Sequence, residues 1–144
     1  MSLVARLLLA VWLLAASTCG LAAEGLAAIP PLKARVTDLT GTLSSQETAA
    51  LEADLAQFEI KHGSQIAVLL VPSTQPETIE AYGIRVGDAW KIGRKGVDDG
   101  TVLIVARSDR ALRIEVGRGL EGAVPDAIAK RLIAEVIAPR FREG

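Results

Sequence analysis

Apolar residues recur along the chain with two different periods, and each period predicts one kind of element. Two short runs, 66–71 and 101–106, are almost continuously apolar, as in strands that are buried on both faces. Over 112–116 apolar and charged residues alternate, which is typical of a half-buried strand. Helical spacing of apolar residues predicts helices over 44–62, 76–92 and 125–138.

The helix ends carry their own chemical signals. Ser44 and Glu47 form a Ser-x-x-Glu capping box at the start of the first helix, and Gly63 supplies the left-handed residue that ends it. Prolines mark other boundaries, with helix starts expected at Pro76 and Pro125 and a helix end at Pro139.

The order of the elements predicts the topology. Strand 66–71, the second helix and strand 101–106 form a βαβ unit with parallel strands, and strand 112–116 returns from 101–106 as an antiparallel hairpin. An extended segment at 35–38 is expected at the edge, and the last helix is expected to pack on the sheet through a broad apolar face: Ile128, Leu132, Ile133, Val136 and Ile137. The prediction is an α/β fold, a three-layer α/β/α sandwich with a small mixed sheet.

The first 23 residues have the composition of a secretory signal peptide. Arg6 is their only charge, an apolar stretch follows it, and small residues up to Ala23 suit cleavage. Residues 24–34 are then a linker, and 35–144 form one domain. The expected location is the periplasm or the cell surface.

Composition excludes several classes of function for the processed chain. Cys19 lies in the leader and is the only cysteine, so disulfides and thiol catalysis are not expected. Loss of Arg6 leaves 15 basic and 17 acidic residues, a net charge of −2 with no basic stripe. Aromatic residues make up only 3% of the chain, so nucleic acid is not an expected partner.

Four carboxylates are expected to converge at one edge of the sheet. A hairpin brings the start of its first strand next to the end of its second, so Asp98 and Asp99 should lie near Glu121 and Asp126. Such oxygen ligands suit Ca²⁺ or Mg²⁺, and without histidine or cysteine they do not suit zinc. The alternative is that these residues serve only as turn and helix-cap residues.

Glycines surround these acidic residues. Gly100 follows Asp98-Asp99, and Gly117, Gly119 and Gly122 match the G-x-G-x-x-G pattern of dinucleotide-binding loops. The preceding strand is the return arm of a hairpin, however, and Glu121 would repel a pyrophosphate, so no dinucleotide site is expected. The four glycines are instead expected to shape the loops.

Several motifs together resemble the TPM domain family. The residues that carry the resemblance are Val36-Thr37-Asp38, Asp98-Asp99-Gly100, Gly117-x-Gly119-Leu120-Glu121-Gly122, Pro125-Asp126 and Pro139-x-Phe141. The resemblance covers about 35–144. It departs from the family at Arg118, where an aromatic residue is common. The chain also stops where members usually continue into another helical segment and often a membrane span, which implies a truncated domain.

The resemblance implies an exported domain that binds Ca²⁺ or Mg²⁺. Its first functional expectation is an accessory module in membrane-protein assembly, repair or quality control, with membrane proteins or membrane-bound complexes as partners. The alternative is a weak metal-assisted acid phosphatase, in which Asp98 or Asp99 would be the catalytic nucleophile or base. A structural surface module without a ligand also stays open.

Overall fold

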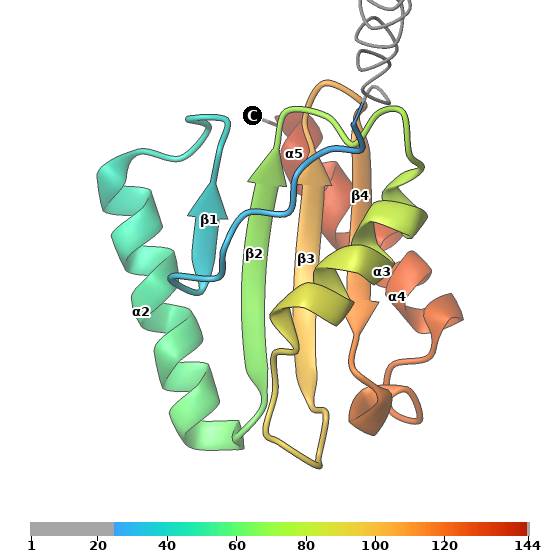
Figure 1. Ribbon diagram of the computed structural model, residues 1–144. Helices are drawn as coiled ribbons and strands as arrows, with labels where there is room; N and C mark the ends of the chain where they lie inside the picture. The colour runs from blue at the N-terminus through green and yellow to red at the C-terminus, as the bar shows by residue number, and fades with distance from the viewer. Residues whose placement is uncertain (1–24, 144) are drawn as a thin grey trace, which may run out of the picture.

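A computed structural model describes residues 25–143 as a four-stranded mixed sheet with helices on both faces (Figure 1). The predicted signal peptide lies outside the described residues. The strands are β1 (Val36–Asp38), β2 (Gln65–Val71), β3 (Gly100–Ala106) and β4 (Ala111–Val116). The main helices are α2 (Ser45–His62), α3 (Ile79–Trp90) and α4 (Asp126–Leu132). Within 25–143 no helix has the length and the apolar character needed to span a membrane.

The sheet has the predicted topology. Its strand order is β1-β2-β3-β4, with β1 parallel to β2, β2 parallel to β3, and β4 antiparallel to β3. The hairpin register pairs Thr101 with Val116 and Ala106 with Ala111. The start of β3 and the end of β4 therefore meet at one end of the sheet, and the β3–β4 turn lies at the other end. The predicted α/β sandwich with a βαβ unit and a hairpin is confirmed.

The larger part of the core lies between the sheet and α3, which crosses in front of it in Figure 1. From α3, Tyr82 and Val86 are fully buried against Leu69 of β2 and Ile104 of β3. The indole of Trp90 donates a hydrogen bond to the carbonyl of Pro30, and the Tyr82 hydroxyl donates one to Ala28. These two bonds tie the predicted linker across the α3 layer.

The opposite face of the sheet carries a second, smaller cluster. Leu51 and Leu55 of α2 pack there against Val68 and Leu70 of β2 and Val105 of β3. The capping box of α2 is present in both directions: Ser44 Oγ accepts from the Glu47 amide, and the Glu47 carboxylate accepts from the Ser44 amide. Gly63 ends the helix in the left-handed conformation, as predicted. Helix α3 starts at Ile79, three residues later than the expected start at Pro76, because Thr78 caps its first turn.

The last helical segment differs from the prediction in two ways. It does not end at Pro139: a π-helical turn, η3 (Ile133–Ile137), leads into α5 (Ala138–Glu143). The wider turn places Pro139 in the first turn of α5, where a missing N–H costs little. The predicted apolar face packs on the sheet only in part: Ile133 and Ile137 are half-buried, whereas Ile128, Leu132 and Val136 are 39%, 39% and 55% exposed and Ala129 alone of α4 is buried.

The alternation in β4 predicts that its charged residues face solvent, and the structure shows that they do not. Arg113 and Glu115 point toward α3, form an ion pair at 2.9 Å, and are 18% and 20% exposed. A Cβ at Gly83 of α3 would lie 3.1 Å from the Arg113 side chain, and one at Gly87 would lie 3.3 Å from Glu115. The two glycines thus let α3 pack directly on this ion pair, and edge strand β4 is covered on both faces.

Candidate functional site

The two loops that carry the predicted acidic residues lie side by side at one end of the sheet. The amide of Gly117 donates to the carbonyl of Gly100 at 2.8 Å, and the amide of Gly119 donates to the carbonyl of Asp98 at 3.0 Å. The second bond extends the hairpin contact beyond the last residue pair of the strands. The loop before β3 and the loop after β4 are therefore joined backbone to backbone, as the hairpin argument expects.

Close backbone approach explains three of the four glycines. A Cβ at Gly119 would overlap the carbonyl oxygen of Val97, and a Cβ at Gly117 would overlap that of Asp98. A Cβ at Gly100 would collide with the carbonyl of Ile92 in the loop after α3. Gly122 has open space around its Cα hydrogens, with nothing within 4 Å of an added Cβ. The first three positions thus admit no side chain without movement of the backbone.

Asp99 is buried and serves the loop before β3. Its carboxylate accepts from the Arg94 amide at 2.8 Å and from the Arg94 guanidinium Nε at 2.8 Å, with only 4% of the side chain exposed. The Arg94 guanidinium and amide hold the pKa of Asp99 below its usual range. This carboxylate therefore joins the two ends of the 94–99 loop.

The contact between Asp99 and Arg94 should make the free energy of unfolding depend on pH at acidic pH. Because the pKa of Asp99 is lowered in the folded state, the unfolded chain takes up this proton at a higher pH than the folded chain. The stabilisation is then complete above about pH 5 and is lost as the pH falls through about 4 toward the lowered pKa. Urea unfolding of the wild type and Asp99→Asn should show a difference in free energy that shrinks as the pH falls through this range. A difference that stays constant would contradict the assignment.

The other three predicted carboxylates are exposed and occupy separate positions. Asp98 has a left-handed backbone conformation, with φ of 54°. Asp126 begins α4, and its carboxylate lies 3.0 Å from the Lys130 ammonium, which lowers its pKa, and 3.8 Å from the Arg113 guanidinium. Among residues 25–143, Asp98 and Glu121 form no ion pair.

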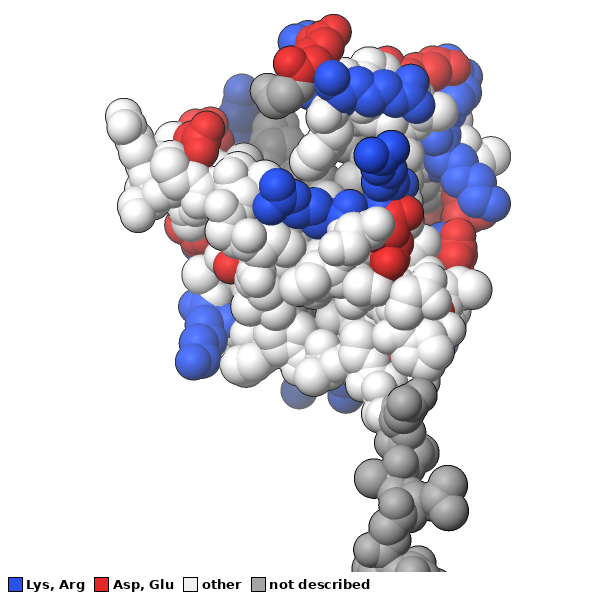
Figure 2. Space-filling view, turned by 90° about the horizontal axis from the view of Figure 1, so that it is seen from above, with Lys and Arg blue, Asp and Glu red and all other residues white. Residues whose placement is uncertain are grey.

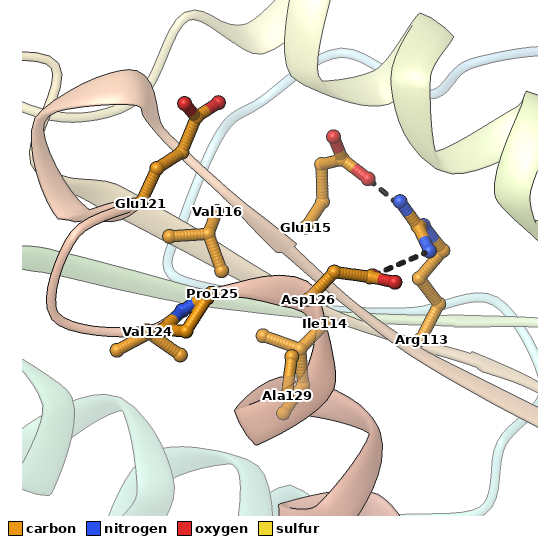
Figure 3. Close-up of a pocket in the computed structure, with 9 residues that line it drawn as sticks. All are labelled: Arg113, Ile114, Glu115, Val116, Glu121, Val124, Pro125, Asp126 and Ala129. Carbon is orange, nitrogen blue, oxygen red and sulfur yellow. Dashed lines mark hydrogen bonds and ion pairs between the residues drawn. The ribbon is translucent and has the colours of Figure 1, made fainter.

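A pocket of about 290 Å³ lies along the outer edge of β4 and contains two of the predicted acids (Figure 3). Its charged lining consists of Arg113, Glu115, Glu121 and Asp126. Its apolar lining consists of Ile114, Val116, Val124, Pro125 and Ala129. In Figure 3, the carboxylates of Glu115 and Asp126 both reach toward the Arg113 guanidinium, and Glu121 stands apart on the loop.

Sequence reasoning missed Arg113 and Glu115 as site residues. The alternation in β4 assigned them to a solvent face, and two charged residues on an edge strand are ordinary on that assignment. The available signal was the pair of glycines, Gly83 and Gly87, on the same side of the second predicted helix. Two glycines on one side of a helix leave room for long side chains of the neighbouring strand to pack against the helix backbone.

The predicted ligands do not form a ready-made cation site. No three acidic, histidine or cysteine side chains of the described part of the chain are placed to hold one metal ion. Asp99 is held by Arg94, and Asp126 is held by Lys130. The structure brings together the backbones of the two loops, and it leaves the carboxylates of Asp98 and Glu121 open to solvent.

Comparison with known proteins agrees with this description. The family model of the TPM domain matches residues 36–144, so the chain belongs to the TPM domain family. It is similar to the N-terminal domain of a protein from P. gingivalis, solved by solution NMR, at 30% identity and a TM-score of 0.68; the match covers 76% of this chain and 70% of that one.

A second solved structure supports the fold alone. The N-terminal domain of a Corynebacterium glutamicum protein matches at 20% identity with a TM-score of 0.61, over 81% of this chain and 76% of that one. Among curated proteins no match is found.

Proposed function

We propose that this TPM domain is an exported accessory module for membrane-protein assembly, repair or quality control, and that it binds Ca²⁺ or Mg²⁺ at its loop edge. The accessory role rests on membership of the TPM domain family, and one observation carries the cation site. The loops that bear Asp98 and Glu121 are fixed against each other by the amide of Gly119, while both carboxylates are exposed and form no ion pair within residues 25–143. Two such carboxylates on neighbouring loops supply the oxygen ligands that a hard cation prefers.

Asp126 is the third ligand that such a cation could recruit. Its contact with Lys130 is an exposed i,i+4 ion pair, with side chains 60% and 69% exposed. Exposed pairs of this kind contribute about 0.3–0.5 kcal/mol, so little would be lost if Asp126 turned toward a cation. Waters would complete the coordination shell. A site with few protein ligands and no preformed geometry belongs to the weak range, with a dissociation constant of about 10⁻⁴ to 10⁻³ M.

A thermal titration tests cation binding. At a cation concentration ten times the dissociation constant, mass action should stabilise the folded state by about 1.4 kcal/mol. For a domain of this size that corresponds to a rise in Tm of roughly 5 °C. Asp98→Asn and Glu121→Gln should each remove most of the rise, measured against NaCl of equal ionic strength.

A matched control is available on α3. Glu80 is exposed and lies on a different element, so Glu80→Gln removes one charge without touching the loops. Its Tm should rise with Ca²⁺ or Mg²⁺ as the wild type does. If neither cation raises the Tm of the wild type, or if Glu80→Gln loses the rise as fully as Glu121→Gln, the proposed site is wrong and the acids serve only as turn and cap residues.

The alternative function is a weak metal-assisted acid phosphatase. Of the two candidate nucleophiles, Asp99 has both carboxylate oxygens bonded to Arg94 and is buried, which leaves Asp98. The exposed side chains of Lys95 and Arg118 lie on the same two loops and could bind phosphate oxygens. Hydrolysis of p-nitrophenyl phosphate that needs the cation and disappears in Asp98→Asn would favour the phosphatase; the accessory module predicts no hydrolysis.

A further inference from the structure

The two outer strands of the sheet, β1 and β4, differ in how their free edges are bonded (Figure 1). Strand β1 has only three residues, and its outward amide at Val36 donates to the Glu52 carboxylate of α2 at 2.8 Å. Helix α2 thus covers that edge with a side-chain hydrogen bond. Strand β4 is twice as long, with six residues.

The outward backbone groups of β4 have no such partner. The register with β3 and the bond from the Gly117 amide to Gly100 direct the amides and carbonyls of 111, 113 and 115 toward β3. Those of Leu112, Ile114 and Val116 point away from the sheet, and within residues 25–143 none of them bonds to another element. A row of unpaired amides and carbonyls on an edge strand is a template for pairing with another extended chain.

The features that commonly protect an edge strand do not protect β4. Such features are bulges, prolines and charged side chains that stand at the edge. The pairing with β3 runs from Ala111 to Val116 without a bulge, and this stretch contains no proline. Its two charged residues, Arg113 and Glu115, pair with each other beneath α3. The backbone edge of β4 is therefore open to a fifth strand.

The pocket beside β4 indicates which side chains such a strand would carry. In Figure 3, the carboxylates of Glu115 and Glu121 point to one side of the pocket, whereas Ile114, Val124 and Ala129 lie on the other side. Successive side chains of an extended chain point to opposite faces, so alternate residues of an added strand meet the acids and the apolar wall. Glu121 is exposed and forms no ion pair within residues 25–143, which leaves it available to a basic side chain.

We propose that β4 binds an extended segment of a partner protein as a fifth, antiparallel strand, in which apolar residues alternate with lysine or arginine. Hydrogen bonds to the backbone of Leu112, Ile114 and Val116 provide affinity, and the pocket provides specificity. Antiparallel pairing is the more stable arrangement per residue.

Charge favours this occupant over a second copy of the chain. Three carboxylates and one guanidinium line the pocket, so two copies joined through β4 would bring two acid-rich surfaces together. The end of the sheet that Figure 2 looks down on mixes basic and acidic side chains and favours neither sign of partner. The proposal does not rest on the proposed function, although it shares Glu121 with the cation site.

Fluorescence anisotropy in EDTA tests the proposal with a labelled peptide of alternating valine and lysine, about nine residues long. Directly opposite residues of an antiparallel pair share a face, so the valines lie opposite Ile114 and Val116 and form the hydrogen bonds to β4. N-methylation of the central valines should weaken binding about tenfold or more, because each methyl group removes a donor. The same number of N-methyl groups on lysines, whose amides point away from β4, should change binding by no more than about twofold.

Two measurements on the protein locate the binding. With saturating peptide, hydrogen exchange at the amides of Ile114 and Val116 should slow by about tenfold, and the Arg113 amide, which faces β3, should not change. Glu121→Gln should weaken binding about two- to fivefold. Glu80→Gln removes an exposed charge from α3 and should bind the peptide as the wild type does.

Three results would overturn the proposal: no binding of the peptide to the wild type, equal weakening by valine and lysine methylation, or unchanged exchange at Ile114 and Val116. It is also overturned if the free protein sediments as a dimer in which these two amides already exchange slowly, since a second copy then occupies β4. EDTA removes divalent cations from the assay, so a failure here is distinct from a failure of the cation titration.

Discussion

Replacing Gly119 by alanine should destabilise the domain by about 2–4 kcal/mol, a large share of the free energy of unfolding of a domain of this size. A Cβ at this position overlaps the carbonyl oxygen of Val97, which is backbone and cannot rotate away. Relief of that overlap separates the two loops and breaks the hydrogen bond from the Gly119 amide to Asp98. We expect Tm to fall by roughly 10–20 °C, measured by circular dichroism at 222 nm.

Gly122 is the matched control in the same loop. An added Cβ there meets no atom within 4 Å, and its φ is not in the left-handed region. Gly122→Ala should therefore change the free energy of unfolding by no more than about 0.5 kcal/mol. Equal losses in Gly119→Ala and Gly122→Ala would show that the two loops are not packed backbone to backbone.

Arg113→Asp should destabilise the domain by about 2–3 kcal/mol, although the alternation in β4 predicts that a charge is tolerated there. Removal of the guanidinium leaves Glu115 without its partner beneath α3, and the new carboxylate adds repulsion from Glu115 and Asp126. The loss should be smaller than for a fully buried pair, because both side chains keep about a fifth of their exposure. Urea unfolding measures it.

Two further variants show whether the ion pair is the cause. Arg113→Glu combined with Glu115→Arg restores an ion pair beneath α3 and should recover at least half of the loss. Leu112→Asp, on the face that packs toward α2, should cost several kcal/mol with no such rescue. Tolerance of Arg113→Asp at wild-type stability would mean that β4 exposes its charged face.

Most of the fold could be predicted because its signals are local. The Ser44–Glu47 capping box and Gly63 lie within a few residues of the helix ends that they specify. The hairpin and the βαβ unit follow from the order and spacing of apolar runs, since antiparallel neighbours need only a short turn. The same logic correctly placed the Asp98-Asp99 turn beside the glycine loop.

Prediction was wrong where packing between elements decides the result. The apolar spacing of Ile128, Leu132 and Val136 identifies a helix with an apolar face but does not identify what covers that face, and the structure leaves all three exposed. Pro139 is compatible with a helix only because the π turn before it shifts the hydrogen-bond register. Neither effect has a signature within a short window of sequence.

The sequence by itself determined the element types, the strand order around the βαβ unit and the hairpin, and the meeting of the two loops at one sheet end. Only the tertiary structure decided which carboxylates have partners. Asp99 pairs with Arg94, and Arg113 pairs with both Glu115 and Asp126. Asp98 and Glu121 are exposed and form no ion pair within residues 25–143. The physical reason is range: hydrogen-bonded turns and apolar periods act between near neighbours, whereas charge pairing depends on side-chain positions that packing sets to within about an ångström.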